Sequence, residues 1–245
     1  MYEELKQILD NGRHMVFFGG AGVSTESGIP DFRSEKGLYQ AQNRYGVAPE
    51  YLLSEECLRT EPVTFFEYFR ENLMPTDAKP NKAHIALAML EEQGKLAAVI
   101  TQNVDGLHQA AGSKNVLELH GSAQDNRCME CGARYARDFF QQDKHWKDGI
   151  PRCPACGGTV RPWVVLYGES LDQECIRRSV DAIAAADVLI VGGTSLAVWP
   201  AAGFLDYFTG DQLVLINRGP TAMDQRANLI IREPIGEVLG ACLNI

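Results

Sequence analysis

Four of the seven cysteines form two C-x-x-C pairs, Cys128 with Cys131 and Cys153 with Cys156. Each pair places two thiolates on one tight turn, and two such turns close a tetrahedral four-sulfur site that suits structural zinc. A closed site leaves no open coordination position for catalysis. The alternatives are a redox dithiol, which usually has one such pair at a helix start, and unrelated core cysteines. The pattern favours zinc, and the other cysteines are expected to be buried apolar residues: Cys57, Cys175 and Cys242.

The segment around these cysteines interrupts a regular alternation of apolar runs. Short runs typical of buried strands alternate with helical patterns, which predicts a parallel sheet covered by helices on both faces. We therefore expect an α/β fold, a doubly wound, Rossmann-like parallel sheet. The expected strands are residues 14–18, 96–101, 116–119, 188–191 and 213–216, and the expected helices are 1–11, 81–93, 171–185, 200–208 and 235–243.

Two insertions depart from this alternation within a single expected domain, 1–245. Residues 34–80 are rich in Tyr and Phe at irregular spacing, and we interpret them as a helical insertion with a loop beside the ligand site. Residues 126–159 are rich in Cys, Gly and charge, and they form the expected zinc module. The Rossmann-like part then consists of about 1–33, 81–125 and 160–245.

The charge balance narrows the classes of partner. With 23 Lys and Arg against 32 Asp and Glu, the net charge of −9 disfavours binding to a phosphate backbone. No stretch approaches the roughly 18 apolar residues that a membrane span needs. The first eleven residues lack the basic and then apolar design of a signal peptide. We therefore expect a cytoplasmic protein with no nucleic-acid and no membrane partner.

A glycine cluster, Gly19, Gly20 and Gly22, follows the first expected strand. Glycines let backbone N–H groups approach a phosphate closely. We expect a helix directly after this turn, which would point its positive end at the anion. The cluster departs from the dehydrogenase fingerprint, because Thr25 stands where the third glycine would fall. Taken alone, the cluster predicts either a phosphate-binding turn or a plain glycine turn.

Further polar strings stand at the ends of expected strands, in residues 28–33, 101–108, 119–121 and 193–195. Ligands of open α/β sheets bind at the carboxyl ends of the strands, so these strings are expected to converge. In this order, with the glycine cluster and the cysteine pairs, they resemble the sirtuin family over almost the whole chain. The resemblance implies a protein lysine deacetylase that uses NAD as co-substrate and releases nicotinamide and O-acyl-ADP-ribose. It also implies one structural zinc ion.

The resemblance implies His120 as the general base and Asn103 as its catalytic partner. An imidazole titrates near neutrality and can take a proton from a ribose hydroxyl. A histidine between an apolar strand and a glycine is otherwise more often structural, and it is the Leu119-His120-Gly121 match that favours catalysis. His108 is the competing histidine, and we expect it to be structural.

By the same resemblance, Asp105 and Val104 hold the carboxamide of NAD, Phe32 shields the reacting carbon, and Asp31 supports the site. Arg33, Ala21 and Thr25 hold the diphosphate, Gln102 and Asn103 orient the ribose, and the adenosine end meets Thr194, Ser195 and Asn217. The full expected NAD site is Gly20, Ala21, Gly22, Thr25, Asp31, Phe32, Arg33, Gln102, Asn103, Val104, Asp105, His120, Gly193, Thr194, Ser195 and Asn217.

The acyl-lysine peptide is expected to pair with an extended segment, Val164, Val165, Leu166, Tyr167 and Gly168. Leu166 and Tyr167 stand where the family more often has a bulkier aromatic and a phenylalanine. Relatives that favour acidic acyl groups share a Tyr-x-x-Arg pair, which this chain lacks; Phe66 and Phe69 stand in the nearest register. The sequence therefore predicts an apolar acyl pocket that prefers acetyl-lysine.

The sequence also bears on three other functions. Mono-ADP-ribosyl transfer to protein uses the same activation of NAD and is not excluded by the sequence. A non-catalytic sensor of NAD or acyl-lysine would tolerate loss of His120 or Asn103, and both are present. An NAD-dependent dehydrogenase is disfavoured by the altered glycine fingerprint.

Overall fold

The computed structural model describes residues 2–30, 44–73 and 77–245. Its centre is a six-stranded sheet in the order β11-β10-β9-β1-β2-β3, in which every neighbouring pair is parallel. The central strands are buried along almost their whole length, which explains why they read as continuous apolar runs. The strands are β1 (Met15–Gly19), β2 (Leu96–Thr101), β3 (Val116–Glu118), β9 (Val188–Gly192), β10 (Gln212–Ile216) and β11 (Leu229–Ile231).

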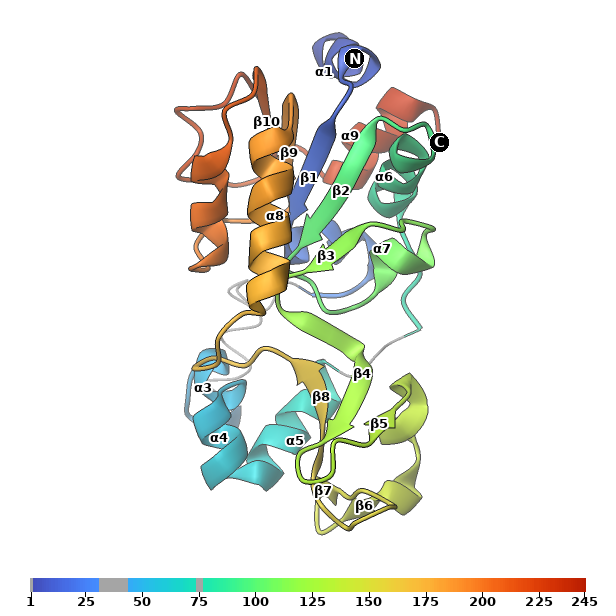
Figure 1. Cartoon of the computed structure of the whole chain (residues 1–245), viewed down its shortest axis with the longest axis vertical. Helices are drawn as coiled ribbons and strands as arrows, with labels where there is room; N and C mark the ends of the chain where they lie inside the picture. Colours follow the sequence, from blue (N-terminus) through green and yellow to red (C-terminus); the bar gives the residue numbers. More distant parts are fainter. Residues whose placement is uncertain (1, 31–43, 74–76) are drawn as a thin grey trace.

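Helices cover both faces of this sheet, as Figure 1 shows. Successive side chains of a strand point to opposite faces, so Phe17 belongs to one apolar core and Phe18 to the other. The first core is closed by α1 (Glu3–Asn11), α6 (Lys82–Glu92) and α9 (Ile235–Leu243), and the second by α8 (Gln173–Ala185) and η5 (Ala201–Tyr207). The predicted doubly wound α/β fold is confirmed.

A second, smaller body contains the cysteine pairs. Its antiparallel sheet has the order β5-β4-β8, and a two-stranded ribbon, β6-β7, lies beside it. Figure 1 shows this body at one end of the six-stranded sheet, with β4 leading into it. Its strands and short helices are β4 (Gly121–Cys128), β5 (Arg134–Tyr135), η3 (Arg137–Gln141), η4 (Asp143–His145), β6 (Trp146–Lys147), β7 (Ile150–Pro151) and β8 (Val160–Val164).

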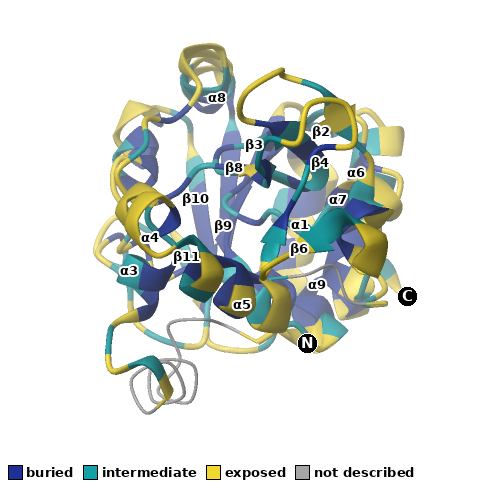
Figure 2. Ribbon diagram, turned by 90° about the horizontal axis from the view of Figure 1, so that it is seen from below, coloured by how far each residue is buried: buried dark blue, intermediate teal, exposed yellow. Residues whose placement is uncertain are grey.

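The described part of the helical insertion packs onto this small sheet. Its helices are α3 (Pro49–Leu52), α4 (Glu55–Thr60) and α5 (Pro62–Asn72). They share one core with β4, η3 and β8, and that core is rich in aromatic rings from α5 and η3. In Figure 2 the inner sides of these helices are buried and their outer sides exposed. The small sheet extends beyond residues 126–159, because β4 already begins at Gly121 and β8 continues to Val164.

Two predictions of local structure are wrong. The glycine cluster is followed by two single 3-10 turns, η1 (Ala21–Val23) and η2 (Thr25–Ser27), instead of a helix that could point its dipole at an anion. The Gly22 N–H donates to Gly193 O at 2.8 Å, so it bonds to another loop and not within a helix of its own segment. The helix expected over 200–208 is the 3-10 helix η5, which begins after Pro200 and contains Gly203, both poor α-helix formers.

The other differences concern ends and short elements. The strand β11 has three residues, too few to give a periodic signal, and α7 (Leu107–Ala110) has four. The remaining predicted helices and strands are present, with ends that differ by up to two residues. Within the described ranges, no helix combines the length and apolar character needed to cross a bilayer.

Candidate active site

A cavity of about 400 Å³ lies where the carboxyl ends of the strands face the small body. Five segments of the predicted site line it. Four of them follow strands of the six-stranded sheet at their carboxyl ends, as expected for an open α/β sheet, and the fifth, residues 164–168, begins at the last residue of β8 in the small sheet. The predicted residues in the lining are Gly20, Ala21, Gly22, Gln102, Asn103, Val104, Asp105, His120, Val164, Val165, Leu166, Tyr167, Gly168, Gly193, Thr194 and Ser195.

Not every predicted residue belongs to this lining. Asp31, Phe32 and Arg33 lie outside the described residues. Among those described, Thr25 and Asn217 do not line the cavity. The Thr25 hydroxyl donates to Gly22 O at 2.9 Å, which stabilises the glycine turn from behind.

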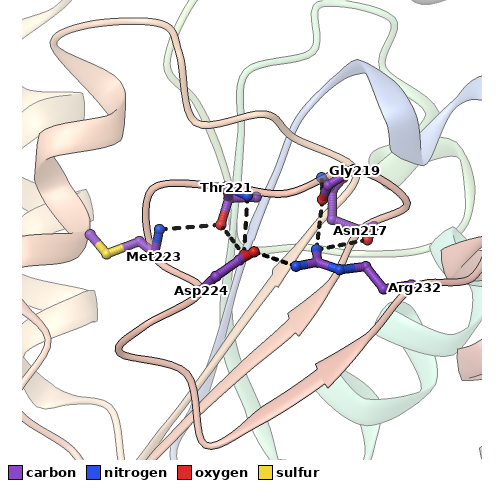
Figure 3. A network of polar contacts seen from close by, with 6 residues as sticks. All are labelled: Asn217, Gly219, Thr221, Met223, Asp224 and Arg232. Atoms are coloured by element: carbon purple, nitrogen blue, oxygen red, sulfur yellow. Dashed lines mark hydrogen bonds and ion pairs between the residues drawn. The ribbon is translucent and has the colours of Figure 1, made fainter.

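Asn217 follows β10 and belongs to a polar network that closes its loop. Its side-chain amide donates to Gly219 O at 2.9 Å. Arg232 donates to the carbonyl oxygens of Asn217 and Gly219 and pairs with Asp224, as Figure 3 shows. The network holds the loop after β10 in one shape beside the strand ends.

The glycine cluster allows the loops after β1 and β9 to come into close contact. A Cβ on Gly22 would come within 2.8 Å of Gly193 Cα, and one on Gly193 within 2.3 Å of Val23 N. Gly193 also has a φ of 59°, which favours glycine. Since the Gly22 N–H already bonds to Gly193 O, these glycines bring the loops after β1 and β9 together, in addition to any part in phosphate binding.

A chain of hydrogen bonds fixes the polar end of β2. Asn103 Nδ2 donates to Ser24 Oγ at 3.1 Å, and Ser24 Oγ donates to Asp105 Oδ2 at 2.7 Å. The other oxygen of Asp105 accepts from the Leu107 N–H at 2.9 Å. Ser24 is 1% exposed, so its hydroxyl is shielded from solvent. Ser24 was missed by the sequence reasoning, although it stands two residues after the glycine cluster.

His120 joins the two sheets. Its Nδ1 lies 2.9 Å from Gln102 O, and its own carbonyl accepts from the Val165 N–H at 2.8 Å. A carbonyl can only accept, so the neutral ring carries its proton on Nδ1 and its lone pair on Nε2. Because His120 lines the cavity, that arrangement suits a base acting on a ligand there.

The competing histidine, His108, is in a different environment. It is 1% exposed, its ring centroid lies 4.7 Å from that of His84, and it does not line the cavity among the residues described. Burial, with His84 as a second cause, lowers the pKa of His108 to about 3. Burial likewise lowers the pKa of His84 to about 4, against an opposing effect of Asp105. Both rings are therefore neutral parts of the core.

The segment expected to pair with the peptide is anchored on two sides. The Val165 N–H bonds to His120 O, and the Tyr167 N–H donates to Leu53 O at 3.0 Å. In return, the Glu55 N–H donates to Tyr167 O at 3.0 Å. The helical insertion therefore holds the outer end of this segment.

The two phenylalanines expected at the acyl pocket do not line the cavity. Phe66 and Phe69 are 0% and 1% exposed and lie in the aromatic core of the small body. Ile29, Pro30 and Leu107 also line the cavity; they lie within the strings 28–33 and 101–108 but were not named as site residues. The other lining residues were missed because nothing in their local spacing distinguishes them: Pro49, Glu50, Leu53, Asn72, Leu73, Ala78, Ala123, Gln124, Arg137, Glu169, Leu171, Val198, Trp199 and Pro200.

The four paired cysteines converge as predicted. The Sγ atoms of Cys128, Cys131, Cys153 and Cys156 all lie within 4.8 Å of one another. Cys128 and Cys156 are 3.5 Å apart, and Cys131 and Cys153 are 3.7 Å apart. Zinc–sulfur bonds of about 2.3 Å in a tetrahedron separate sulfurs by about 3.8 Å, so the cluster fits zinc.

The remaining cysteines are separate from this cluster. Cys57 and Cys242 are buried as expected, at 0% and 5% exposure. Cys175 is only half-buried, because it stands in the first turn of the surface helix α8.

Comparisons with known proteins agree on one family. The family model described as "Sir2 family" matches residues 20–200. The chain is 54% identical over 236 residues to an NAD-dependent protein deacetylase of Clostridium acetobutylicum, covering 96% of this chain and 95% of the relative. It is 52% identical over 242 residues to one of Clostridium perfringens, covering 98% of each.

Solved structures agree over the same length. The chain superimposes on "Sir2-p53 peptide-NAD+" with a TM-score of 0.88 and 35% identity, covering 100% of this chain and 98% of that one. A Sir2 variant with a deacetylated p53 peptide and 3′-O-acetyl ADP ribose gives a TM-score of 0.90 and 36% identity, covering 99% and 97%. "Sir2 bound to acetylated peptide" gives 0.86 and 34%, covering 100% and 98%.

Proposed function

Because the chain belongs to the Sir2 family, we propose that it is an NAD-dependent protein deacetylase with His120 as its general base. The enzyme transfers the acyl group of an acyl-lysine side chain to ADP-ribose and releases nicotinamide. When bound, NAD supplies the ADP-ribosyl group that accepts the acyl group. Related Sir2 structures hold NAD+, an acetylated peptide or an acetyl ADP ribose, which supports this chemistry.

One observation carries the residue assignment. His120 is bonded through Nδ1 to the loop after β2 and through its carbonyl to Val165 of the peptide-pairing segment. The base is thus fixed in relation to both expected substrates. With its lone pair on Nε2, the imidazole takes the proton of a ribose hydroxyl as that oxygen attacks the acyl group.

The chain Asn103, Ser24 and Asp105 orders the other side of the cavity. Asp105 accepts from both Ser24 and Leu107, so the carboxylate is held in place. Its main-chain carbonyl also accepts from Gln124 Nε2 at 2.8 Å. We assign Asp105, with Val104, to the nicotinamide carboxamide, and Asn103, with Gln102, to the ribose. Amide and carboxylate groups that are already positioned lose little entropy when a ligand binds.

The peptide is expected to add to Val164, Val165, Leu166, Tyr167 and Gly168 as an extended strand. This mode reads backbone shape, which suits an enzyme that acts on acyl-lysine in proteins. The cluster of Cys128, Cys131, Cys153 and Cys156 would hold one zinc ion that stabilises the small body. Zinc-bound thiolates favour a reducing compartment, so we propose a cytoplasmic location.

The test is incubation with an acetylated peptide and NAD, measuring nicotinamide and O-acetyl-ADP-ribose together. Formation of both in equal amounts supports deacetylation. Nicotinamide accompanied by modified protein, without the acetyl ester, would indicate ADP-ribosyl transfer and contradict the proposal. Omitting the peptide is the control for simple hydrolysis of NAD.

A further inference from the structure

A half-buried ion pair between Arg161 and Glu169 lies next to the peptide-pairing segment and has no part in the roles assigned above. Arg161 lies in β8, and its side chain is 11% exposed. Its guanidinium forms two bonds to Glu169, from one terminal nitrogen to Oε1 at 2.5 Å and from the other to Oε2 at 2.9 Å. Such bidentate pairs combine charge with fixed geometry.

Both partners also hold the backbone between them. Arg161 donates to Val164 O at 2.6 Å, and Glu169 Oε2 accepts from the Leu166 N–H at 2.8 Å. Val165, the residue between these two groups, is held from the other side by its bond to His120 O. The ion pair and the backbone of His120 therefore hold residues 164–166 from opposite sides.

The electrostatics agree with a firmly held pair. Burial raises the pKa of Glu169, but the hydrogen bonds from Arg161 and from the Leu166 N–H bring its pKa below the ordinary value. Glu169 thus stays ionised at neutral pH. It also lines the cavity, directly after Gly168, whose φ of 96° requires a flexible residue.

We infer that Arg161 and Glu169 are positioning residues for the acyl-lysine peptide, which set the shape of residues 164–168 and hence the affinity for that substrate. The inference rests on the proposed function. Without the pair, Val164 O and the Leu166 N–H lose their charged partners. The segment must then become ordered when the peptide binds, and the entropy lost in ordering it lowers the affinity for the peptide. The NAD side of the cavity, built from the loops after β1, β2 and β9, is left unchanged.

The test compares the change in KM for the acetylated peptide with the change in KM for NAD. Glu169→Gln keeps the size of the side chain but removes the charge. It is expected to raise KM for an acetylated peptide about tenfold, while KM for NAD and kcat change less than about twofold. Arg161→Lys keeps the charge but loses the two-pronged geometry, so its effect should be intermediate. Glu174→Gln removes a pair of the same type, with Arg177, on the exposed face of α8 and is the matched control.

Two further measurements separate the possible failures. Thermal unfolding of each variant shows whether the fold is intact, and fluorescence anisotropy of a labelled acetylated peptide measures affinity without turnover. Unchanged peptide affinity in Glu169→Gln, or equal rises in both KM values, would overturn the inference while leaving the deacetylase assignment in place. A wild-type protein that neither binds nor deacetylates the peptide would overturn both.

Discussion

In the six-stranded sheet the strands themselves form the core, whereas in the three-stranded sheet the strands contribute little of it. β1 and β9 are buried at every position and are covered by aliphatic residues from both sides. The small body instead relies on aromatic rings from α5 and η3, with Cys128 and Cys153 among its core residues. The core of the large body is thus built from apolar side chains, whereas the stability of the small body depends also on what the sulfurs bind.

The active-site geometry arises at the boundary between these two bodies. His120 follows β3 of the large sheet and precedes β4 of the small one. Its ring is held by the first body and its carbonyl by the segment after β8. Disorder in the small body should therefore disturb the peptide side of the cavity before the NAD side.

Zinc removal should produce the largest difference between the stabilities of the two bodies. Structural zinc contributes about 10–16 kcal/mol of apparent binding free energy, comparable with the stability of a whole domain. Chelation, or Cys128→Ser, should unfold the small body and abolish peptide binding while the six-stranded sheet persists. Trp146 and Trp163 lie in the small body, so their fluorescence reports its loss, and hydrogen exchange of β1 and β9 reports the large sheet.

Cys175→Ser is the control, since Cys175 lies outside the cluster. It should keep its metal, measured by elemental analysis, and its activity. Folded, active wild-type protein without metal would contradict the zinc assignment.

Acid should weaken the large body through His84 and His108. Burial lowers their pKa values to about 4 and about 3, so the folded state resists protonation while the unfolded state takes protons below about 6.5. The free energy of unfolding should fall as pH drops from about 6.5 toward about 4, by about 1.4 kcal/mol per pH unit for each histidine. Urea unfolding at several pH values measures it.

The variant His108→Leu should reduce the pH slope of the unfolding free energy by about one proton relative to the wild type. Equal slopes in wild type and His108→Leu would show that His108 does not contribute.

His120→Ala tests the residue that joins the two bodies. Loss of one acid-base group usually costs about 100-fold or more in rate, so deacetylation should fall by that factor while NAD binding and folding persist. Slow release of nicotinamide should survive, because attack by the acyl oxygen needs no proton from the ribose hydroxyl. His108→Ala should instead lower stability. Near-normal deacetylation by a folded, NAD-binding His120→Ala protein would refute the assignment.

The smallest expected effect concerns the acyl group. Among the described residues lining the cavity, the acidic ones are Glu50, Asp105 and Glu169, of which Glu169 is paired with Arg161, and the basic one is Arg137. An acidic acyl group would meet net repulsion, so acetyl-lysine should be preferred over succinyl-lysine, by about tenfold for one unfavourable charge contact of about 1.4 kcal/mol. Competition between two otherwise identical peptides measures this ratio, and faster turnover of the succinylated one would contradict the prediction.

Features that show in a few consecutive residues can be predicted from the sequence. The apolar runs of β1, β2 and β9, the two cysteine pairs and the polar strings after the strands are each visible within a few consecutive residues. Because parallel strands end at a common edge, their order in the chain was enough to predict that Gly20, Asn103, His120 and Thr194 share one cavity.

Contacts between residues that are remote in sequence are visible only in the folded protein. Gly22 and Gly193 need to be glycines because their backbones meet, and Ser24 acts because it lies between Asn103 and Asp105. Phe66 and Phe69 lie in a core instead of the cavity, because the burial of a side chain depends on how many neighbours from several elements surround it. The spacing of residues in the sequence does not give the number of such neighbours, so the burial of these two side chains is known only from the packed structure.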